Sequence, residues 1–187
     1  MHLLSFIIFV LWLTSEILLN VLLRPSQQDK QQQDKNSLNV IWLVIIISVV
    51  AASQLGYRTK APIAANFWPV HYTGLVLVVL GVILRFAAIR SLGKFFTVTV
   101  TIREGHQLKT DGFYKYLRHP SYSASLLSFL GYGLSYNNWY SVAVVVIPVF
   151  IAFSYRISIE EKVLQGQFGD RYRAYMEHTK RLIPFIY

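Results

Sequence analysis

The sequence predicts an all-α integral membrane protein, with about five transmembrane helices in a single domain that covers residues 1–187. Hydrophobic residues make up 54% of the chain and are gathered in runs long enough to cross a bilayer. Charged residues make up only 14%, whereas soluble domains usually contain about 25%. The basic residues that give the net charge of +9 lie mostly between the apolar runs, as is typical of loops that set membrane topology.

Residues 1–89 contain three predicted spans, and residues 90–187 contain a polar segment, a helical hairpin and a tail. The three spans are residues 3–23, 38–55 and about 70–89. Segment 24–37 is rich in Gln, Asp and Lys, a composition typical of a solvated loop. Pro62 and Pro69 break the chain before the third span.

The polar segment, residues 90–118, includes the alternating residues 97–102, a pattern that favours a strand. Two apolar runs follow it, residues 121–136 and 139–157. The connector between these runs is short, so we expect them to form a hairpin of two helices. Pro148 lies within the second run and predicts a kink there.

Basic residues are distributed unevenly between the two sides that five spans would create. Segments 24–37 and 90–118 and the tail from Arg156 contain 3, 6 and 6 Lys or Arg residues, whereas the loop on the other side contains Arg58 and Lys60. The positive-inside rule therefore places the N-terminus outside and the C-terminus in the cytoplasm. This distribution fits contact with anionic lipid headgroups and argues against binding of nucleic acid.

A cluster of polar side chains precedes the fourth apolar run, in residues 112–122. Four side chains that hydrogen-bond or titrate lie within nine residues there: Tyr114, Arg118, His119 and Tyr122. Pro120 disfavours a helical conformation at His119, so we expect a helix to begin near Pro120. The free backbone N–H groups of its first turn, with the hydroxyls of Ser121 and Tyr122, would suit a carboxylate or phosphate.

Arg156 and Glu160 lie four residues apart at the end of the fifth run and therefore share a helix face. A simple ion pair near lipid phosphate is one interpretation. The other is that Arg156 clamps a carboxylate or phosphate while Glu160 holds an ammonium group. Glu16, within the first run, needs a polar partner, whether that contact is structural or faces substrate. Arg85 in the third run is a candidate, although it could instead extend to the interface.

Other types of site have no signal in this sequence. No spacing of His, Asp and Glu matches a metal site, so we predict no bound metal. The chain has no Cys, and it contains neither a glycine-rich phosphate loop nor a Ser-His-Asp arrangement.

Several motifs in the second half of the chain, taken as an ordered set, are similar to those of a known family. They are Gly112-Phe-Tyr114, Arg118-His119-Pro120-Ser-Tyr122, Arg156 with Glu160-Glu161, Phe168-Gly169-Asp170-Arg-Tyr172, Tyr175 and Thr179-Lys-Arg181-Leu-Ile-Pro184. From Glu104 to Pro184 the chain resembles the isoprenylcysteine carboxyl methyltransferase family. Its short length resembles the small prokaryotic-type members.

The resemblance implies S-adenosylmethionine as cofactor, in a cytoplasm-facing pocket formed by the C-terminal half. The residues that it implies for cofactor contact are His106, Gln107, Leu108, Lys109, Tyr114, His119, Pro120, Ser121, Tyr122 and Glu160. It implies that Arg156 faces the substrate, so Arg156 and Glu160 are the predicted catalytic residues. The acceptor would be a lipid or a prenylated molecule that enters from the bilayer.

The type of acceptor decides whether a base is needed. An isoprenylcysteine carboxylate is already ionised at neutral pH, so Arg156 would only have to orient it. A phenol or amine must lose a proton, and His119 or Glu160 would then become candidate bases.

Two functions of other classes remain open from the sequence. Membrane sterol-type reductases that use NADPH have a similar Arg-His-Pro-x-Tyr segment and a Tyr-rich tail, but they are generally longer. A non-catalytic lipid-binding protein would also accommodate polar residues at a membrane boundary. The sequence gives no indication of oligomeric state.

Overall fold

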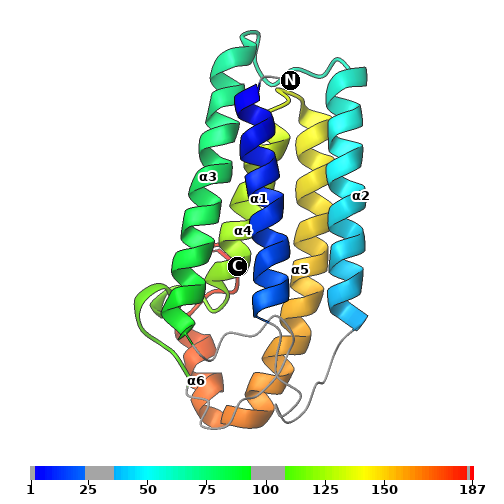
Figure 1. Ribbon diagram of the computed structural model, residues 1–187. Helices are drawn as coiled ribbons and strands as arrows, with labels where there is room; N and C mark the ends of the chain where they lie inside the picture. Colours follow the sequence, from blue (N-terminus) through cyan, green and yellow to red (C-terminus); the bar gives the residue numbers. More distant parts are fainter. Residues whose placement is uncertain (1–2, 24–35, 94–107, 185) are drawn as a thin grey trace.

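The structure is a computed structural model that describes residues 3–23, 36–93, 108–184 and 186–187. Five helices run alternately up and down in one bundle, and a sixth lies beyond one end of it (Figure 1). The bundle helices are α1 (Leu3–Leu22), α2 (Asn36–Arg58), α3 (Phe67–Leu92), α4 (Pro120–Leu134) and α5 (Trp139–Phe168). A 3-10 turn, η2 (Gly112–Lys115), precedes α4, and α6 (Asp170–His178) follows α5.

Four helices of the described chain, α1, α2, α3 and α5, are long and apolar enough to cross a membrane. The protein is therefore an integral membrane protein, as the sequence predicts. The fourth apolar run is confirmed as a helix, but α4 has only 15 residues. At about 1.5 Å per residue it covers about 22 Å, less than the roughly 30 Å of a hydrocarbon core. It lies instead between α3 and α5, within the protein.

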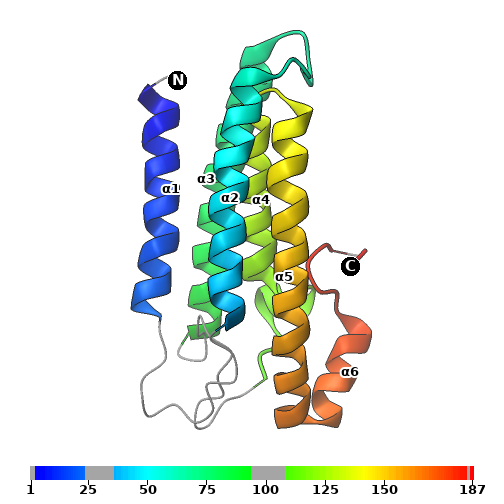
Figure 2. The same ribbon diagram turned by 90° about the vertical axis from the view of Figure 1, so that its right-hand side faces the viewer.

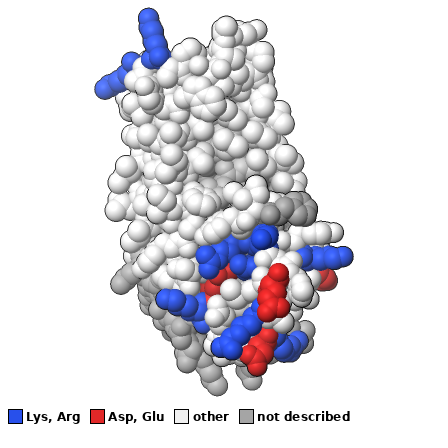
Figure 3. Space-filling model, turned by 180° about the vertical axis from the view of Figure 1, so that it is seen from behind, with Lys and Arg blue, Asp and Glu red and all other residues white. Residues whose placement is uncertain are grey.

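The two ends of the bundle differ in what they contain. We call the end where α1 and α3 finish and α4 begins the polar end; α5 extends beyond it and leads into α6 (Figure 1). The opposite end, which contains residues 59–66 and 135–138, is called the loop end. Seen from behind, the charged side chains gather at the polar end, apart from a small group at the loop end (Figure 3).

Helices α3 and α4 approach each other closely because small residues face each other across their interface. A β-carbon added to Gly131 of α4 would lie 2.5 Å from the Gly74 carbonyl oxygen and 2.7 Å from the Val78 nitrogen, both of α3. Added to Gly81, it would overlap Ser128 and Ala124. Lipid gives little hydrophobic drive for helices to associate, so such close backbone contact is a main source of helix adhesion in membranes.

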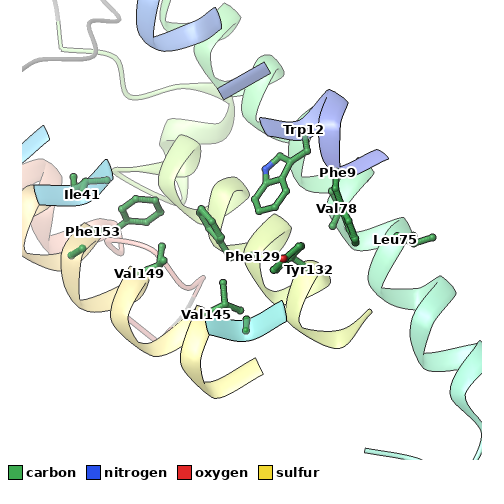
Figure 4. Packing of buried hydrophobic residues seen from close by; sticks show 12 residues of the cluster. Phe9, Trp12, Ile41, Leu75, Val78, Phe129, Tyr132, Val145, Val149 and Phe153 are labelled. Carbon is green, nitrogen blue, oxygen red and sulfur yellow. The ribbon is translucent and has the colours of Figure 1, made fainter. Parts of the chain in front are cut away.

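Helix α1 stands to one side of the other four helices and packs mainly on α3 (Figure 2). Most of its apolar side chains face outward, towards lipid. Two inward aromatic residues join it to the core: Trp12 contacts Phe129 with ring centroids 5.0 Å apart, and Phe9 contacts Tyr132 at 4.9 Å (Figure 4). The expected partner of Glu16 is confirmed, because its Oε2 lies 3.0 Å from Arg85 Nη2.

The expected hairpin of α4 and α5 is also confirmed, with Asn137 and Asn138 between the helices. The Asn138 side chain accepts hydrogen bonds from the nitrogens of Tyr140 and Ser141 and so caps the start of α5. Pro148 lies within α5 and does not end it. The expected strand at residues 97–102 falls outside the described residues.

Candidate active site

The candidate site lies at the polar end, where residues 108–122 meet the extension of α5 and the chain after α6. Residues 117–119 run beside residues 180–182. The Arg118 nitrogen donates to the Lys180 oxygen at 2.8 Å, and the His119 nitrogen donates to the Arg181 oxygen at 3.2 Å. The tail therefore fixes the backbone immediately before α4.

The expected start of α4 is confirmed at Pro120, and His119 is outside the helix with φ −126° and ψ 57°. The Pro ring lacks an N–H and suits a first helical position, so the sequence itself sets this boundary. The His119 oxygen accepts from the nitrogens of Tyr122 and Ser123 at 3.1 and 3.2 Å. The His119 side chain is buried, and its two ring nitrogens face carboxylates, Nδ1 that of Glu160 and Nε2 that of Glu161.

Glu160 and Tyr122 lie on one side of His119. The Tyr122 hydroxyl donates to Glu160 Oε2 at 3.5 Å, and Glu160 Oε1 lies 3.9 Å from His119 Nδ1. The Glu160 side chain keeps 31% of its surface exposed, so its carboxylate is accessible to a ligand. These three predicted site residues therefore share one place in the fold.

Glu161 lies on the other side of His119 and is almost completely buried. Its Oε1 accepts from Arg118 Nε at 2.7 Å and lies 3.5 Å from His119 Nε2. Its Oε2 accepts from Nε and Nη2 of Arg181 at 2.9 and 2.7 Å. We call Glu161, Arg118, Arg181 and His119 the Glu161 cluster.

Sequence reasoning missed Glu161 and Arg181 as members of the site, although the buried face of α5 contained a signal. Val149, Phe153 and Ile157 are buried at intervals of four residues, and Glu161 is the next position in that series. An acid that continues an apolar helical face needs buried partners. Glu160, one residue earlier, leaves that face and remains partly exposed.

Tyr114 of η2 is buried beneath the tail. Its hydroxyl donates to the Ala88 oxygen at 3.3 Å, and its own carbonyl oxygen accepts from the Tyr175 hydroxyl at 2.5 Å. Burial, reinforced by the charge of Glu160, raises the pKa of Tyr114 well above its usual value, and burial raises the pKa of Tyr175 to about 12. Both phenols are therefore neutral hydrogen-bond donors at physiological pH.

Arg156 lies one helical turn before Glu160, in the last part of α5 that packs against α2. Its side chain is 1% exposed, and its Nη1 donates to the Ser37 hydroxyl at the start of α2. The Tyr122 side chain lies close enough to interact with both Arg156 and Glu160. Because Arg156 is buried this deeply, its charge interacts with groups inside the protein and not with solvent.

Arg85 connects α1 and α3 to the first turn of α4. Besides its ion pair with Glu16, Arg85 Nη1 donates to the hydroxyls of Ser121 and Ser125 at 3.3 and 2.5 Å and to the Ser121 oxygen at 3.2 Å. Arg85 therefore does not extend freely to the interface. Glu16 has a structural partner and, through it, helps to fix Ser121.

The structure thus brings together most of the predicted residues at the polar end: Tyr114, His119, Pro120, Ser121, Tyr122, Arg156 and Glu160. Leu108 and Lys109 are partly buried, and Lys109 Nζ lies 2.7 Å from the exposed carboxylate of Asp111. His106 and Gln107 lie outside the described residues. The predicted contacts of all these residues with a cofactor remain predictions.

Comparisons with known proteins agree on one group of membrane proteins. A family model described as phospholipid methyltransferase matches residues 69–171. The chain is 32% identical over 145 residues to a probable protein-S-isoprenylcysteine O-methyltransferase of Oryza sativa subsp. indica, covering 76% of each. It is 34% identical over 146 residues to protein-S-isoprenylcysteine O-methyltransferase B of Arabidopsis thaliana, covering 77% of this chain and 73% of that protein.

A solved structure agrees with these relatives. It is the eukaryotic intramembrane Ras methyltransferase ICMT (isoprenylcysteine carboxyl methyltransferase), which matches with a TM-score of 0.69 and 27% identity. The match covers 96% of this chain but 64% of that one, so the chain spans less than two thirds of the solved protein.

Proposed function

The chain belongs to the isoprenylcysteine carboxyl methyltransferase family of membrane enzymes, and on that premise we propose that it transfers a methyl group from S-adenosylmethionine to a lipidic acceptor at the membrane. The reaction that we propose first is carboxyl O-methylation of an isoprenylcysteine. O-methylation of a related lipid is the alternative.

The observation that carries this proposal is the environment of His119. The buried His119 ring, a partly exposed carboxylate on Glu160 and the start of α4 lie together at one end of a membrane bundle. The amino-acid end of S-adenosylmethionine carries one carboxylate and one ammonium group. A helix start suits the carboxylate, while Glu160 suits the ammonium. The described residues therefore fit this cofactor.

When bound, S-adenosylmethionine supplies a methyl group on a sulfonium, which is an electrophile. The residues of this chain would bind the donor and orient it towards the acceptor. His119 and the first turn of α4 would hold the carboxylate of the donor, and Glu160 would hold its ammonium. Tyr122 donates to Glu160 and would keep that carboxylate in place.

Arg156 is the residue that we assign to the acceptor. It lies at the depth where α2 begins and is shielded from solvent, so an acidic acceptor would reach it from within the membrane. Orientation of the acceptor by a fixed guanidinium supports a reaction that depends on alignment, for which ideal placement is worth up to about 7–11 kcal/mol. A carboxylate acceptor requires no proton removal.

We also propose that the polar end faces the cytoplasm. The basic residues of the described chain gather there, with few at the loop end (Figure 3). By the positive-inside rule, the N-terminus is outside and the C-terminal tail is cytoplasmic. Cysteine scanning with an impermeant reagent tests this, since the chain has no Cys of its own.

Calorimetry with S-adenosylhomocysteine on the purified protein in detergent tests the cofactor. We expect the wild type to bind and Glu160→Gln to bind at least tenfold more weakly, because the variant loses the charge assigned to the ammonium. Glu177→Gln, an exposed change on α6, is the matched control and should bind as the wild type does. A folded wild type that does not bind would contradict the proposal.

The acceptor is tested with a labelled methyl donor and either an S-isoprenylated cysteine or membrane lipid extract. A carboxyl methyl ester releases its label as methanol in base, whereas a phenol ether does not. Base-labile label on the isoprenylcysteine is the expected result. Base-stable label in the lipid extract, with none on the isoprenylcysteine, would replace the first acceptor by the alternative.

A further inference from the structure

Two adjacent carboxylates of α5 have opposite environments. Glu160 is partly exposed and contacts Tyr122, whereas Glu161 is buried between two arginines. In the proposed function Glu160 meets the donor directly. Glu161 cannot do so, since Arg118 and Arg181 already take both of its oxygens. Its role must therefore act through the residues that it holds.

Those residues fix His119 from two directions. The Arg181 side chain binds Glu161, and the Arg181 carbonyl accepts from the His119 nitrogen. Arg118, the residue before His119, binds Glu161 through its own side chain. Glu161 Oε1 also lies 3.5 Å from the His119 ring. The backbone, the chain neighbour and the ring of His119 thus all depend on one carboxylate.

The same carboxylate fastens the tail. Besides binding Glu161, Arg118 donates through Nη1 to the Thr179 oxygen and, at 3.2 Å, to the Met176 oxygen, which lie at the end of α6. The last carbonyls of a helix have no partner within the helix, so Arg118 completes the end of α6. Arg181 in turn has its guanidinium over the Tyr187 ring, 5.6 Å from its centroid.

We propose that Glu161 is a positioning residue for the methyl donor, and that tail residues 179–182 are part of the donor site because Glu161 ties them to His119. The inference rests on the proposed function, since the ligand that His119 meets is the amino-acid end of S-adenosylmethionine. It extends that function to a residue that touches neither donor nor acceptor. Removal of the Glu161 charge releases Arg118 and Arg181 together, and His119 loses its alignment.

A purely structural cluster makes a different prediction. It would hold the tail in place, but His119 would stay aligned without it, because Pro120 and the first turn of α4 would fix it alone. Loss of Glu161 would then lower thermal stability and leave donor affinity unchanged. Donor affinity and the amide hydrogen exchange of the backbone near His119 therefore distinguish the two roles.

The main experiment uses the full chain in detergent with Glu161→Gln, which keeps the shape of the side chain and removes its charge. Three quantities are measured: affinity for S-adenosylhomocysteine, amide hydrogen exchange of residues 116–123 and 179–182 without ligand, and melting temperature. We expect affinity at least tenfold weaker and faster exchange in both segments. In turnover assays the KM for the donor should rise while the KM for the acceptor stays within twofold.

A milder variant covers the case in which Glu161→Gln does not fold. Arg181 keeps 31% of its side chain exposed, and Arg181→Lys preserves its charge while removing the planar fork that binds Glu161. We expect three- to tenfold weaker donor affinity and faster exchange at residues 118–119. Glu177→Gln and Arg173→Gln, both exposed on α6, are matched controls and should behave as the wild type.

Donor affinity and exchange like the wild type in folded Glu161→Gln would overturn the inference, and the same result in Arg181→Lys would overturn it if Glu161→Gln is unfolded. Failure of the proposed function has a different signature: the wild type itself would not bind S-adenosylhomocysteine. In that case, amide hydrogen exchange of residues 118–119, measured without ligand, still decides whether Glu161 holds His119.

Discussion

The two buried histidines of the described chain lie at opposite ends of the bundle and have different types of partner. At the loop end, His71 Nδ1 lies 2.6 Å from the Ser135 oxygen and Nε2 lies 2.9 Å from the Ser5 hydroxyl. A carbonyl only accepts, so Nδ1 carries a proton and Nε2 can accept from Ser5. At the polar end, His119 Nδ1 lies 3.9 Å from Glu160 Oε1 and Nε2 lies 3.5 Å from Glu161 Oε1.

On the proposed function, the difference separates a structural use of buried polarity from a ligand-binding one. His71 of α3 joins Ser5 of α1 to Ser135, just after α4, and both ring nitrogens have partners, so nothing remains for a ligand. His119 lies between two carboxylates, and one of them, Glu160, keeps 31% of its side chain exposed. A buried titratable ring beside a partly exposed carboxylate is therefore a better candidate for a binding site than a buried histidine whose partners are all internal.

The largest effect should come from breaking the Glu161 cluster. Arg118→Leu leaves Glu161 with one of its two arginines and removes the donor to the end of α6. Loss of one partner of a buried ion pair typically costs about 3–5 kcal/mol. Thermal unfolding in detergent measures this loss of stability. Arg173→Leu is the control, because the pair of Arg173 with Asp170 is exposed. Equal melting temperatures for the two variants would contradict this account.

The two histidines should respond differently to the same substitution. His71→Leu leaves the Ser135 oxygen and the Ser5 hydroxyl without their partner, and an unsatisfied buried group costs about 1–3 kcal/mol. The affinity of the His71→Leu variant for S-adenosylhomocysteine should not change. His119→Leu should lower that affinity by tenfold or more, with a smaller loss of stability. Calorimetry and melting curves on both variants test the contrast, and a reversed pattern would refute it.

The contact of α3 with α4 provides a prediction that is independent of polar groups. Gly131→Ala places a methyl group 2.5 Å from the Gly74 oxygen, and overpacking of this kind costs about 1–3 kcal/mol. Gly166→Ala in α5 is the matched control. The methyl group added at position 166 meets no atom within 4 Å. The higher helix propensity of Ala than of Gly should therefore stabilise this variant by up to about 1 kcal/mol. Unfolding experiments should give opposite signs for the two variants.

The smallest effect concerns the contact between Tyr175 and the Tyr114 oxygen. Burial raises the pKa of Tyr175 from 10.0 to about 12, so the folded state binds this proton more tightly than the unfolded state. The stability from this contact is complete below pH 10 and is lost as the pH rises to about 12. Hydrogen exchange in the tail should accelerate in this range. Tyr175→Phe, which lacks the hydrogen bond worth about 0.5–1.5 kcal/mol, should show a weaker dependence on pH.

The sequence was sufficient for features that depend on neighbouring residues. Apolar runs located the bundle helices, Pro120 located the start of α4, and two charges within spans identified the pair of Glu16 and Arg85. The Glu161 cluster depends instead on the convergence of α5, residues 118–119 and the tail, and no local pattern specifies that convergence. The partners of His71 show the same limit, because Ser5 and Ser135 are 66 and 64 residues away in the sequence.

The pairing of residues 117–119 with 180–182 also has a consequence for how the protein is made. Arg118 and Thr179 are 61 residues apart, so at about 5–20 residues per second a ribosome needs roughly 3 to 12 s to reach the second after the first. By then the bundle helices have all been synthesised and can enter the membrane. A chain cut before Thr179 would thus keep its five bundle helices and still lack the segment that fixes His119. On the proposed function, proteolysis of the tail would weaken donor binding without removing the protein from the bilayer.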